Sequence, residues 1–200
     1  FQYVFLFVLF GKILEYSGAL SFVMTLSQAL VGRLCGGPAL VASISSMLVG
    51  SVSGSAVANV MITGSVSIPL MKKMKFEPEM AAGIEASAST GGQIMPPVMG
   101  AVAFVMAQFI GVGYFDVVRA ALIPAILYFL SIIIGVYLYA RRSGIQTLKK
   151  EEVPTFSDVI REPGLVTFTV GLGVLIYLLV IRYSAPLAAI ISMALMLLLG

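Results

Sequence analysis

The sequence predicts an all-α, polytopic membrane protein, and three observations support this fold class. Sixty per cent of the 200 residues are hydrophobic and only 10% are charged, against roughly 25% charged residues in a soluble domain. The apolar residues form long blocks, several of them long enough for membrane helices. Lysine and arginine gather in short clusters between these blocks, as they do in the cytoplasmic loops of membrane proteins.

Composition also excludes several kinds of chemistry. The chain has no histidine, so histidine-based acid–base catalysis and histidine-ligated metals are excluded. Cys35 is the single cysteine, so the chain forms neither an internal disulfide nor a cysteine metal cluster. No pairing of a nucleophile with a base is visible. We therefore expect no enzyme and no cofactor, and the net charge of +3 indicates membrane topology rather than a nucleic-acid partner.

Residues 1–34 are predicted to form the end of one span and a second helix. Residues 1–14 are apolar, and Lys12 and Glu15 mark where this span should leave the membrane. Residues 19–34 mix polar and apolar side chains, which favours an amphipathic helix at the interface, with a short tilted span as the alternative. Both ends of the chain lie inside apolar runs, so we expect a piece of a longer protein.

Residues 38–70 are predicted to form a re-entrant helical hairpin. They hold 33 residues without a charge between Arg33 and the lysines at 72, 73 and 75. One straight helix of that length would reach about 50 Å, beyond the roughly 30 Å of the hydrocarbon core. The positive-inside rule places both basic ends on the cytoplasmic side. The run GSVSGS over 50–55 should therefore form a non-helical tip between arms at about 38–50 and 56–70, facing protein or water.

Residues 79–113 are predicted to form a discontinuous transmembrane helix. These 35 residues are interrupted by TGGQIMPP over 90–97. The two adjacent prolines remove N–H donors and disfavour helical geometry, so half-helices should lie at about 79–90 and 98–110. Together with the hairpin, this segment is expected to form a transport-type unit over residues 35–113.

The rest of the chain is predicted to return to the cytoplasm and cross again. A polar turn over 114–119 should precede a plain span over 120–140, within a unit of residues 114–142. Residues 143–163 should form a cytoplasmic, partly amphipathic connector. Residues 164–200 should hold a further span and the start of a final helix. With this path, all the basic clusters lie on the cytoplasmic side of the membrane.

The two predicted breaks suit a Na⁺ site. Interrupted helices leave backbone carbonyls without partners, and secondary transporters use such carbonyls to hold Na⁺ at the bilayer midplane. Hard cations prefer oxygen ligands. If the breaks meet, they form an oxygen-rich pocket from side chains and carbonyls. The candidate ligands are Ser51, Ser53, Ser55, Asn59, Thr90, Gly91, Gly92, Met95 and Pro97.

A second reading of these residues is helix packing. Gly50 and Gly54 fit the small-xxx-small pattern of membrane helices, and the remaining serines of the hairpin (43, 45, 46, 65 and 67) are expected to pack. Glu85 is expected either to have a function inside the membrane, to bond nearby hydroxyls such as Ser87 or Ser89, or to reach the interface. We expect Gly54, Asn59, Gln93 and Glu85 to lie beside the substrate.

Three runs resemble the large membrane subunit of TRAP (tripartite ATP-independent periplasmic) transporters. They are GSVSGSAVAN over 50–59, IPLM over 68–71 and ASTGGQIMPPVMG over 88–100. The similarity extends to Gly32–Arg33 and to the YARR exit over 139–142. The sequence most resembles the branch with fused small and large subunits, which usually works with a TAXI-type binding protein.

The resemblance implies a fold and a function. It implies an elevator-type transporter with two inverted repeats, of which this chain holds one hairpin. It implies Na⁺-coupled, ATP-independent import of an organic acid delivered by a periplasmic substrate-binding protein, with a small membrane subunit or its fused equivalent, in the bacterial inner membrane. By motif position, Ser51, Ser53 and Ser55 match the family's Na⁺-binding tip, and Gly92, Met95 and Pro97 match its carbonyl donors.

Three alternatives to this function remain at the level of sequence. The first is a hairpin-bearing Na⁺/carboxylate symporter that needs no binding protein. The second is a channel, since breaks lined by serine and glycine can form a filter. The third is a membrane assembly subunit that does not transport, in which small residues serve only packing.

Overall fold

A computed structural model describes residues 2–145, 147–148 and 153–199. These residues are helical, with no β-strand among them, so the all-α prediction is confirmed. The α-helices are α1 (Gln2–Leu14), α2 (Leu20–Val31), α3 (Gly37–Ser53), α4 (Ala56–Lys73), α5 (Pro78–Gly92), α6 (Ala101–Ile110), α7 (Tyr114–Arg142), α8 (Phe156–Arg161), α9 (Gly164–Val180) and α10 (Ala185–Leu199).

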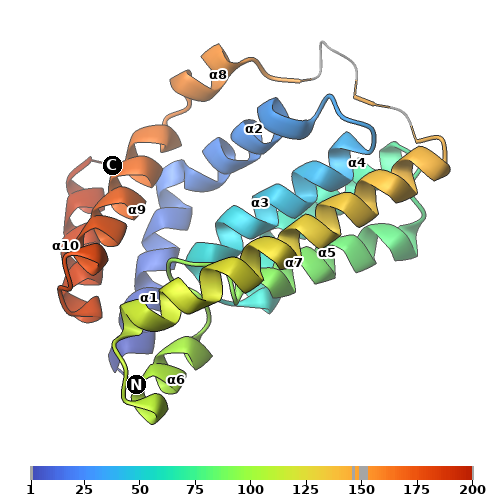
Figure 1. The fold of residues 1–200 in the computed structure, drawn as a ribbon. Helices are drawn as coiled ribbons and strands as arrows, with labels where there is room; N and C mark the ends of the chain where they lie inside the picture. The colour runs from blue at the N-terminus through green and yellow to red at the C-terminus, as the bar shows by residue number, and fades with distance from the viewer. Residues whose placement is uncertain (1, 146, 149–152, 200) are drawn as a thin grey trace.

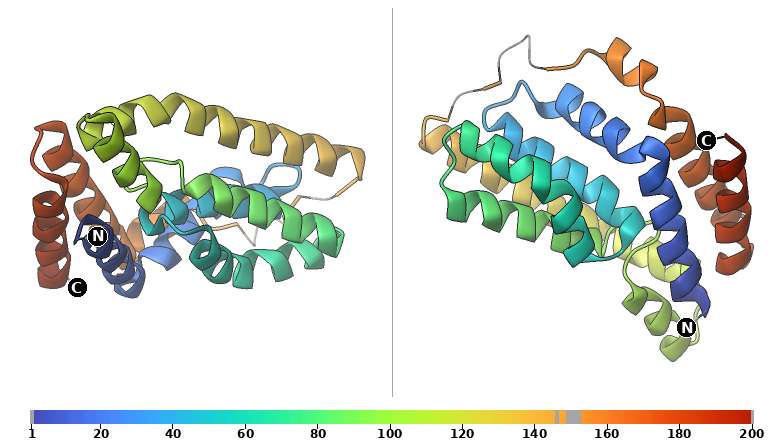
Figure 2. Two further views of the ribbon diagram at one scale, coloured as in Figure 1. Left: turned by 90° about the horizontal axis from the view of Figure 1, so that it is seen from below. Right: turned by 180° about the vertical axis from the view of Figure 1, so that it is seen from behind.

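The helices form two groups (Figures 1 and 2). Helices α3, α4 and α5 pack against one another, and α7 lies along α3 and α5. Helices α1, α9 and α10 pack together at the other end of the molecule. Helix α2 joins the groups because it contacts both α3 and α9. The candidate site lies in the first group, where that group meets α1 and α6.

Helices α1 and α2 are joined by a kink, a π-helical turn η1 (Glu15–Ala19). Gly18 has a positive φ of 83° there, a conformation that glycine adopts without steric cost. The apolar stretch Phe5–Val31 is long enough to cross a membrane. Lys12 and Glu15, where the span is expected to leave the membrane, form an ion pair of 2.8 Å beside this kink, and the exit from the membrane there stays a prediction.

The hairpin prediction corresponds to α3 and α4, which pack side by side. The helical part is longer than expected, because α3 continues through Gly50 to Ser53. Gly54, with a φ of 62°, ends α3, and Ser55 caps α4 by accepting a hydrogen bond from the Ala58 N–H at 3.3 Å. The turn is therefore two residues rather than the six predicted from GSVSGS.

The predicted interruption of 79–113 is a loop over residues 93–100, between α5 and α6. Gly91 and Gly92 belong to α5, so the break begins two residues later than expected. The loop is closed by the Gly100 N–H, which donates to the Gln93 carbonyl at 2.8 Å. The Pro96–Pro97 peptide is cis.

Helix α7 is a second segment long enough to cross a membrane. It begins at Tyr114, so residues 114–119, predicted as a polar turn, are its first turns. One set of large apolar side chains on it is exposed, among them Ile123, Leu127 and Leu138. Within the predicted connector, the structure describes α8, while residues 146 and 149–152 lie outside the described part.

The basic segments gather at one end of the molecule. Lys73 and Lys75, after α4, line a cavity of about 180 Å³ together with Ser143 and Gly144, which follow α7. Near Arg33, the Cys35 thiol donates to the Ile145 carbonyl at 3.5 Å. The segments predicted to be cytoplasmic are thus neighbours in space.

Candidate functional site

The turn of the hairpin packs directly on the loop of the discontinuous helix. The Val98 N–H donates to the Ser51 carbonyl at 3.0 Å. A Cβ atom added to Gly54 would lie 2.1 Å from the Met99 carbonyl oxygen, so main chain meets main chain at this point. The two breaks that the sequence predicts therefore lie against each other, as the pocket hypothesis requires.

A second backbone contact lies one turn deeper, between Gly50 of α3 and Gly92 of α5. A Cβ atom added to Gly92 would lie 2.5 Å from the Gly50 Cα, and one added to Gly50 would lie 2.6 Å from the Gly92 Cα. The latter would also lie 2.8 Å from Nδ2 of Asn59. The absence of side chains at these glycines lets α3, α4 and α5 converge below the tip.

The polar side chains of the hairpin differ in whether they have hydrogen-bond partners. The Ser51 hydroxyl donates to the Leu48 carbonyl at 2.8 Å, and Ser55 is the cap of α4. Asn59 is fully buried, and its Nδ2 donates to the Ser46 carbonyl at 2.8 Å. Two buried oxygens, Oγ of Ser53 and Oδ1 of Asn59, have no hydrogen-bond partner among the described residues. Buried oxygens in this condition are costly unless a further group binds them.

The candidate carbonyls follow the end of α5. The carbonyls of Gly91 and Gly92 accept from the N–H groups of Ile94 at 3.1 Å and Met95 at 3.2 Å. The Pro97 carbonyl accepts from the Tyr114 hydroxyl at 3.0 Å. A carbonyl oxygen has two lone pairs, so each of these groups keeps the capacity to bind a cation.

Some candidates lie away from the contact of tip and loop. Thr90 is exposed, and its hydroxyl donates to the Ala86 carbonyl at 2.7 Å. Gly91 lies under the ring of Tyr128, where an added Cβ would lie 2.3 Å from Cε1. Gln93 is exposed, although it begins the loop and its carbonyl accepts from the Gly100 N–H beside the tip. Their predicted roles as ligands or substrate contacts stay predictions.

A cavity of about 150 Å³ adjoins the contact. It is lined by Ser53, Gly54 and Ser55 of the hairpin and by Val98 and Met99 of the loop, with Phe7 and Val8 of α1 and Phe104 of α6. A larger cavity of about 400 Å³ lies elsewhere, between the starts of α7 and α10. The smaller cavity therefore adjoins the hairpin part of the predicted site, at Ser53, Gly54 and Ser55.

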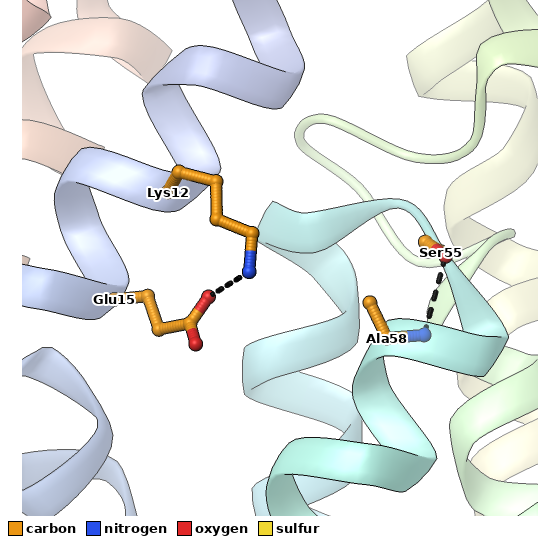
Figure 3. Close-up of polar contacts among 4 residues, drawn as sticks. All are labelled: Lys12, Glu15, Ser55 and Ala58. Atoms are coloured by element: carbon orange, nitrogen blue, oxygen red, sulfur yellow. Dashed lines mark hydrogen bonds and ion pairs between the residues drawn. The ribbon is translucent and has the colours of Figure 1, made fainter.

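Helix α1 brings an ion pair close to the hairpin. Glu15 lines a small cavity of about 30 Å³ together with Ser53. Figure 3 shows its carboxylate paired with Lys12, in the same view as the Ser55 cap of α4. Lys12 pairs with this carboxylate, and the two unpartnered oxygens of the hairpin, on Ser53 and Asn59, belong to neutral groups. That donor set fits a monovalent cation, since Mg²⁺ usually requires carboxylates.

Glu85 lies in a separate polar cluster between α3, α4 and α5. It is 0% exposed, so it does not extend to an interface. Its carboxylate accepts hydrogen bonds from Ser46 at 2.8 Å, Thr63 at 2.5 Å and Ser89 at 3.1 Å, and also from Ser67. Bonding to a hydroxyl such as Ser89 was one of the three expected alternatives. Its proximity to substrate stays a prediction.

Sequence reasoning missed three of the four hydroxyl partners of Glu85. Ser46 and Ser67 were expected only to pack, and Thr63 was not considered. A usable signal exists, because Asn59, Thr63 and Ser67 recur every four residues and so share one face of α4. Tyr114 was also missed, and its position in a supposed turn gave no signal for its contact with the loop.

Comparison with known proteins identifies the family. All of residues 1–200 match the family described as "Tripartite ATP-independent periplasmic transporter, DctM component". The chain belongs to this family. The resemblance to TRAP large membrane subunits is thereby confirmed. Because the family consists of transporter permeases, its members are membrane transport proteins and not enzymes.

Individual relatives agree with the family assignment. The chain is 30% identical over 169 residues to the protein YgiK of Salmonella typhimurium, covering 84% of this chain and 39% of YgiK. It is 28% identical over 155 residues to the C4-dicarboxylate TRAP transporter large permease protein DctM of Vibrio cholerae, covering 78% of this chain and 33% of that protein. It is 26% identical over 144 residues to the sialic acid TRAP transporter large permease protein SiaM of the same organism, covering 72% and 33%. The chain thus spans between a third and two fifths of these relatives.

Proposed function

We propose that the protein containing this chain is the permease subunit of a Na⁺-coupled, ATP-independent importer of an organic acid. Membership of the TRAP large permease family supports transport. The relatives named for their substrates, a C4-dicarboxylate permease and a sialic acid permease, both act on organic acids, which supports the substrate class. The helices of this chain would then lie in the bacterial inner membrane, as a multi-pass protein.

The observation that carries the Na⁺ proposal is the contact of the hairpin turn with the loop 93–100. It joins main chain to main chain and leaves two buried oxygens, on Ser53 and Asn59, without partners. These two side chains, together with the carbonyls of Gly92, Met95 and Pro97, are the groups that would hold Na⁺. The cation would supply positive charge beside the binding place of an anionic substrate.

The partners and the motion follow from the resemblance. We propose that a periplasmic binding protein delivers the acid and that a small membrane subunit, or a fused equivalent, completes the permease. A second inverted repeat would supply the other half of the substrate site, and the transport unit would move as an elevator. The hairpin α3–α4 would be re-entrant, with its turn near the middle of the bilayer.

Uptake in proteoliposomes tests the coupling. The full-length permease is reconstituted with its binding protein, and uptake of a labelled organic acid is measured with an inward Na⁺ gradient or with K⁺ in its place. We expect uptake only with Na⁺ and binding protein. Equal uptake in K⁺ would overturn Na⁺ coupling, and Na⁺-driven uptake without binding protein would favour the simpler symporter.

Single substitutions test the ligands. Ser53→Ala removes an unpartnered buried oxygen, so the Na⁺ concentration for half-maximal uptake should rise several-fold. Ser65→Ala is the matched control, because Ser65 is exposed on α4 and its hydroxyl donates to the Ile62 carbonyl at 2.8 Å. An unchanged Na⁺ dependence in Ser53→Ala would favour the packing role of the serines.

A further inference from the structure

The Glu85 cluster holds an ionisable group that the Na⁺ proposal does not use. Its carboxylate is fully buried and receives hydroxyl hydrogen bonds from three helices: Ser46 on α3, Thr63 and Ser67 on α4, and Ser89 on α5. Such a complete shell of hydroxyls compensates for part of the cost of burying a carboxylate. The sequence therefore builds a dedicated environment for one acidic group.

No basic side chain neutralises this carboxylate among the described residues. The salt bridge among the described residues joins Lys12 to Glu15, away from the Glu85 cluster. Of the elements packed against α5, α3 carries no ionisable side chain, and α4 carries lysines only in its exposed last turn. Besides Glu85, these elements carry the following ionisable groups: Lys72 and Lys73 on α4, Glu79 on α5, and Tyr114, Asp116, Arg119, Tyr128, Tyr137, Tyr139, Arg141 and Arg142 on α7. Of the α7 groups, Tyr128 contacts α5 through the Ser87 carbonyl, at 2.8 Å.

Hydroxyl partners suit either protonation state of Glu85, whereas a lysine or arginine would favour the ionised state alone. Serine and threonine both donate and accept. The Ser46 and Thr63 hydroxyls lie 2.9 Å apart and either can be the donor. The Asn59 main-chain carbonyl, 2.8 Å from the Thr63 hydroxyl, is a second acceptor for the Thr63 proton. The hydroxyl groups can therefore rotate so that one of their oxygens accepts a hydrogen bond from a protonated carboxyl group, without displacement of heavy atoms.

Two of the residues that bond Glu85, Ser46 and Thr63, also bond Asn59. Ser46 accepts at its carbonyl from Nδ2 of Asn59, and Thr63 donates to the Asn59 carbonyl. Asn59 in turn adjoins Gly50, which contacts Gly92, and its Oδ1 is one of the two unpartnered oxygens of the hairpin. The Thr63 hydroxyl, which bonds both the Glu85 carboxylate and the main-chain carbonyl of Asn59, thus joins Glu85 to a residue proposed to hold the cation.

We propose that Glu85 is a proton-binding site that is linked to the cation site through Asn59. The carboxylate gains one proton, which comes from water, on one of its oxygens. No other covalent bond changes, and the buried negative charge is neutralised. The linkage rests on the proposed Na⁺ function, but proton binding at Glu85 does not.

Infrared difference spectroscopy tests proton binding directly. The reconstituted full-length permease is titrated over a range of pH, in NaCl or in choline chloride. We expect a C=O stretching band of a protonated carboxyl group that disappears as the pH rises. The band should be absent from Glu85→Gln and present in Glu79→Gln, since Glu79 is an exposed glutamate on the same helix. A spectrum without a titrating band assigned to Glu85 would overturn the proposal.

The linkage has its own readout, the pH dependence of the Na⁺ concentration for half-maximal uptake. In the wild type and in Glu79→Gln this concentration should change by about fivefold or more across the titration of the infrared band, a typical size for coupling between sites. In Glu85→Gln it should be constant. An equal pH dependence in all three proteins would overturn the linkage.

Two further outcomes separate the proposals. If uptake by the wild type does not depend on Na⁺, the Na⁺ proposal fails while the infrared test of Glu85 stands. If Glu85→Gln does not fold, Ser67→Ala replaces it, because this change removes one donor to the carboxylate and leaves the acid in place. The midpoint of the carboxyl band should then shift, and an unshifted midpoint would contradict proton binding within the hydroxyl cluster.

Discussion

Gly50 and Gly92 set the distance between the hairpin and the discontinuous helix. A methyl group at Gly92 would lie 2.5 Å from the Gly50 Cα, and backbone atoms cannot move aside as the end of a flexible side chain can. Gly92→Ala should therefore destabilise the protein by about 1–3 kcal/mol, the usual cost of overpacking, and should lower thermal stability in detergent.

A matched glycine on the same helix provides the control. Gly83 lies on α5, where an added Cβ would meet nothing within 4 Å. Gly83→Ala should raise stability by about 0.5–1 kcal/mol, because alanine favours a helix interior more than glycine does. Equal melting temperatures for the two variants would contradict the close contact at Gly92.

Tyr114 couples the first turn of α7 to the loop. Its hydroxyl lies 3.0 Å from the Pro97 carbonyl and 2.5 Å from the Val98 carbonyl, and its ring stacks on Phe104 with centroids 4.1 Å apart. Tyr114→Phe keeps the ring and removes the hydrogen bond, so stability should fall by about 1 kcal/mol. The Na⁺ dependence of uptake should weaken if the hydroxyl orients the Pro97 carbonyl.

The control for this substitution is Tyr16→Phe, because Tyr16 is 86% exposed on the turn η1. Thermal unfolding in detergent, followed with and without Na⁺, measures both effects. A Tyr114→Phe protein that melts as the wild type does would show that the hydroxyl contributes nothing to the loop.

The sequence located the candidate site through residue types with unusual backbone behaviour. Gly54, Pro96 and Pro97 mark real interruptions, because they act on their own backbone and need no tertiary information. Gly50, Gly91 and Gly92 were interpreted as breaks by the same reasoning but are helical. Their small size serves tertiary contacts with Gly92, Tyr128 and Gly50, respectively, and such contacts are not visible in local sequence.

At the scale of elements, the sequence predicts the positions of the two breaks to within a few residues. It does not predict where the neighbouring helices begin and end. The hairpin turn is shorter than GSVSGS because serines 51 and 53 are compatible with the last turn of α3. Helix α7 extends back to Tyr114 because nothing in residues 114–119 forbids a helix. Contacts between elements, such as the two bonds to Glu162 from Ser21 at 3.1 Å and Thr25 at 2.9 Å, were beyond prediction because they join residues far apart in sequence.

Helix α8 provides a prediction for pH. The Thr155 hydroxyl and N–H donate to the Asp158 carboxylate at 2.7 and 2.8 Å, and these hydrogen bonds hold the pKa of Asp158 below its ordinary value of 3.8. A lowered pKa means that the cap stabilises α8 above the ordinary value and is lost as the pH falls below it. Amide exchange over 156–161, corrected for the intrinsic rate, should therefore increase in acid.

Asp158→Ala should remove this pH dependence, since it lacks the titrating group. Exchange in α8 should then be fast at neutral pH as well as in acid. A wild-type α8 whose corrected exchange is constant from neutral pH to below 3.8 would contradict a stabilising role for the capping box.

At the scale of the whole molecule, the clustering of basic segments gives a topology prediction. Single cysteines at positions 73 and 144, in a Cys35→Ser background, should react with a membrane-impermeant thiol reagent from the same side of the membrane. A cysteine at position 112, between α6 and α7, should react from the opposite side. Labelling of 73 and 144 from different sides would contradict the out-and-back path of α5, α6 and α7 between them.

The exposed apolar surface of α7 gives a prediction for insertion. Leu127 lies near the middle of this helix and is 62% exposed. Leu127→Arg should make insertion of α7 less favourable by about 3 kcal/mol, the difference for a basic residue at a helix centre. A glycosylation-based insertion assay measures this shift against Leu127→Ala, and equal insertion of the two would place α7 outside the lipid.

The short turn of the hairpin has a consequence for the order in which the protein assembles. Helix α3 has 17 residues and is about 25 Å long, so alone it would not span the hydrocarbon core. Its end at Gly54 exposes backbone groups that lipid cannot satisfy, whereas α5 and the loop 93–100 can. During biosynthesis the hairpin should therefore enter the bilayer only after α5 has emerged from the ribosome, as the closing step of its helix group.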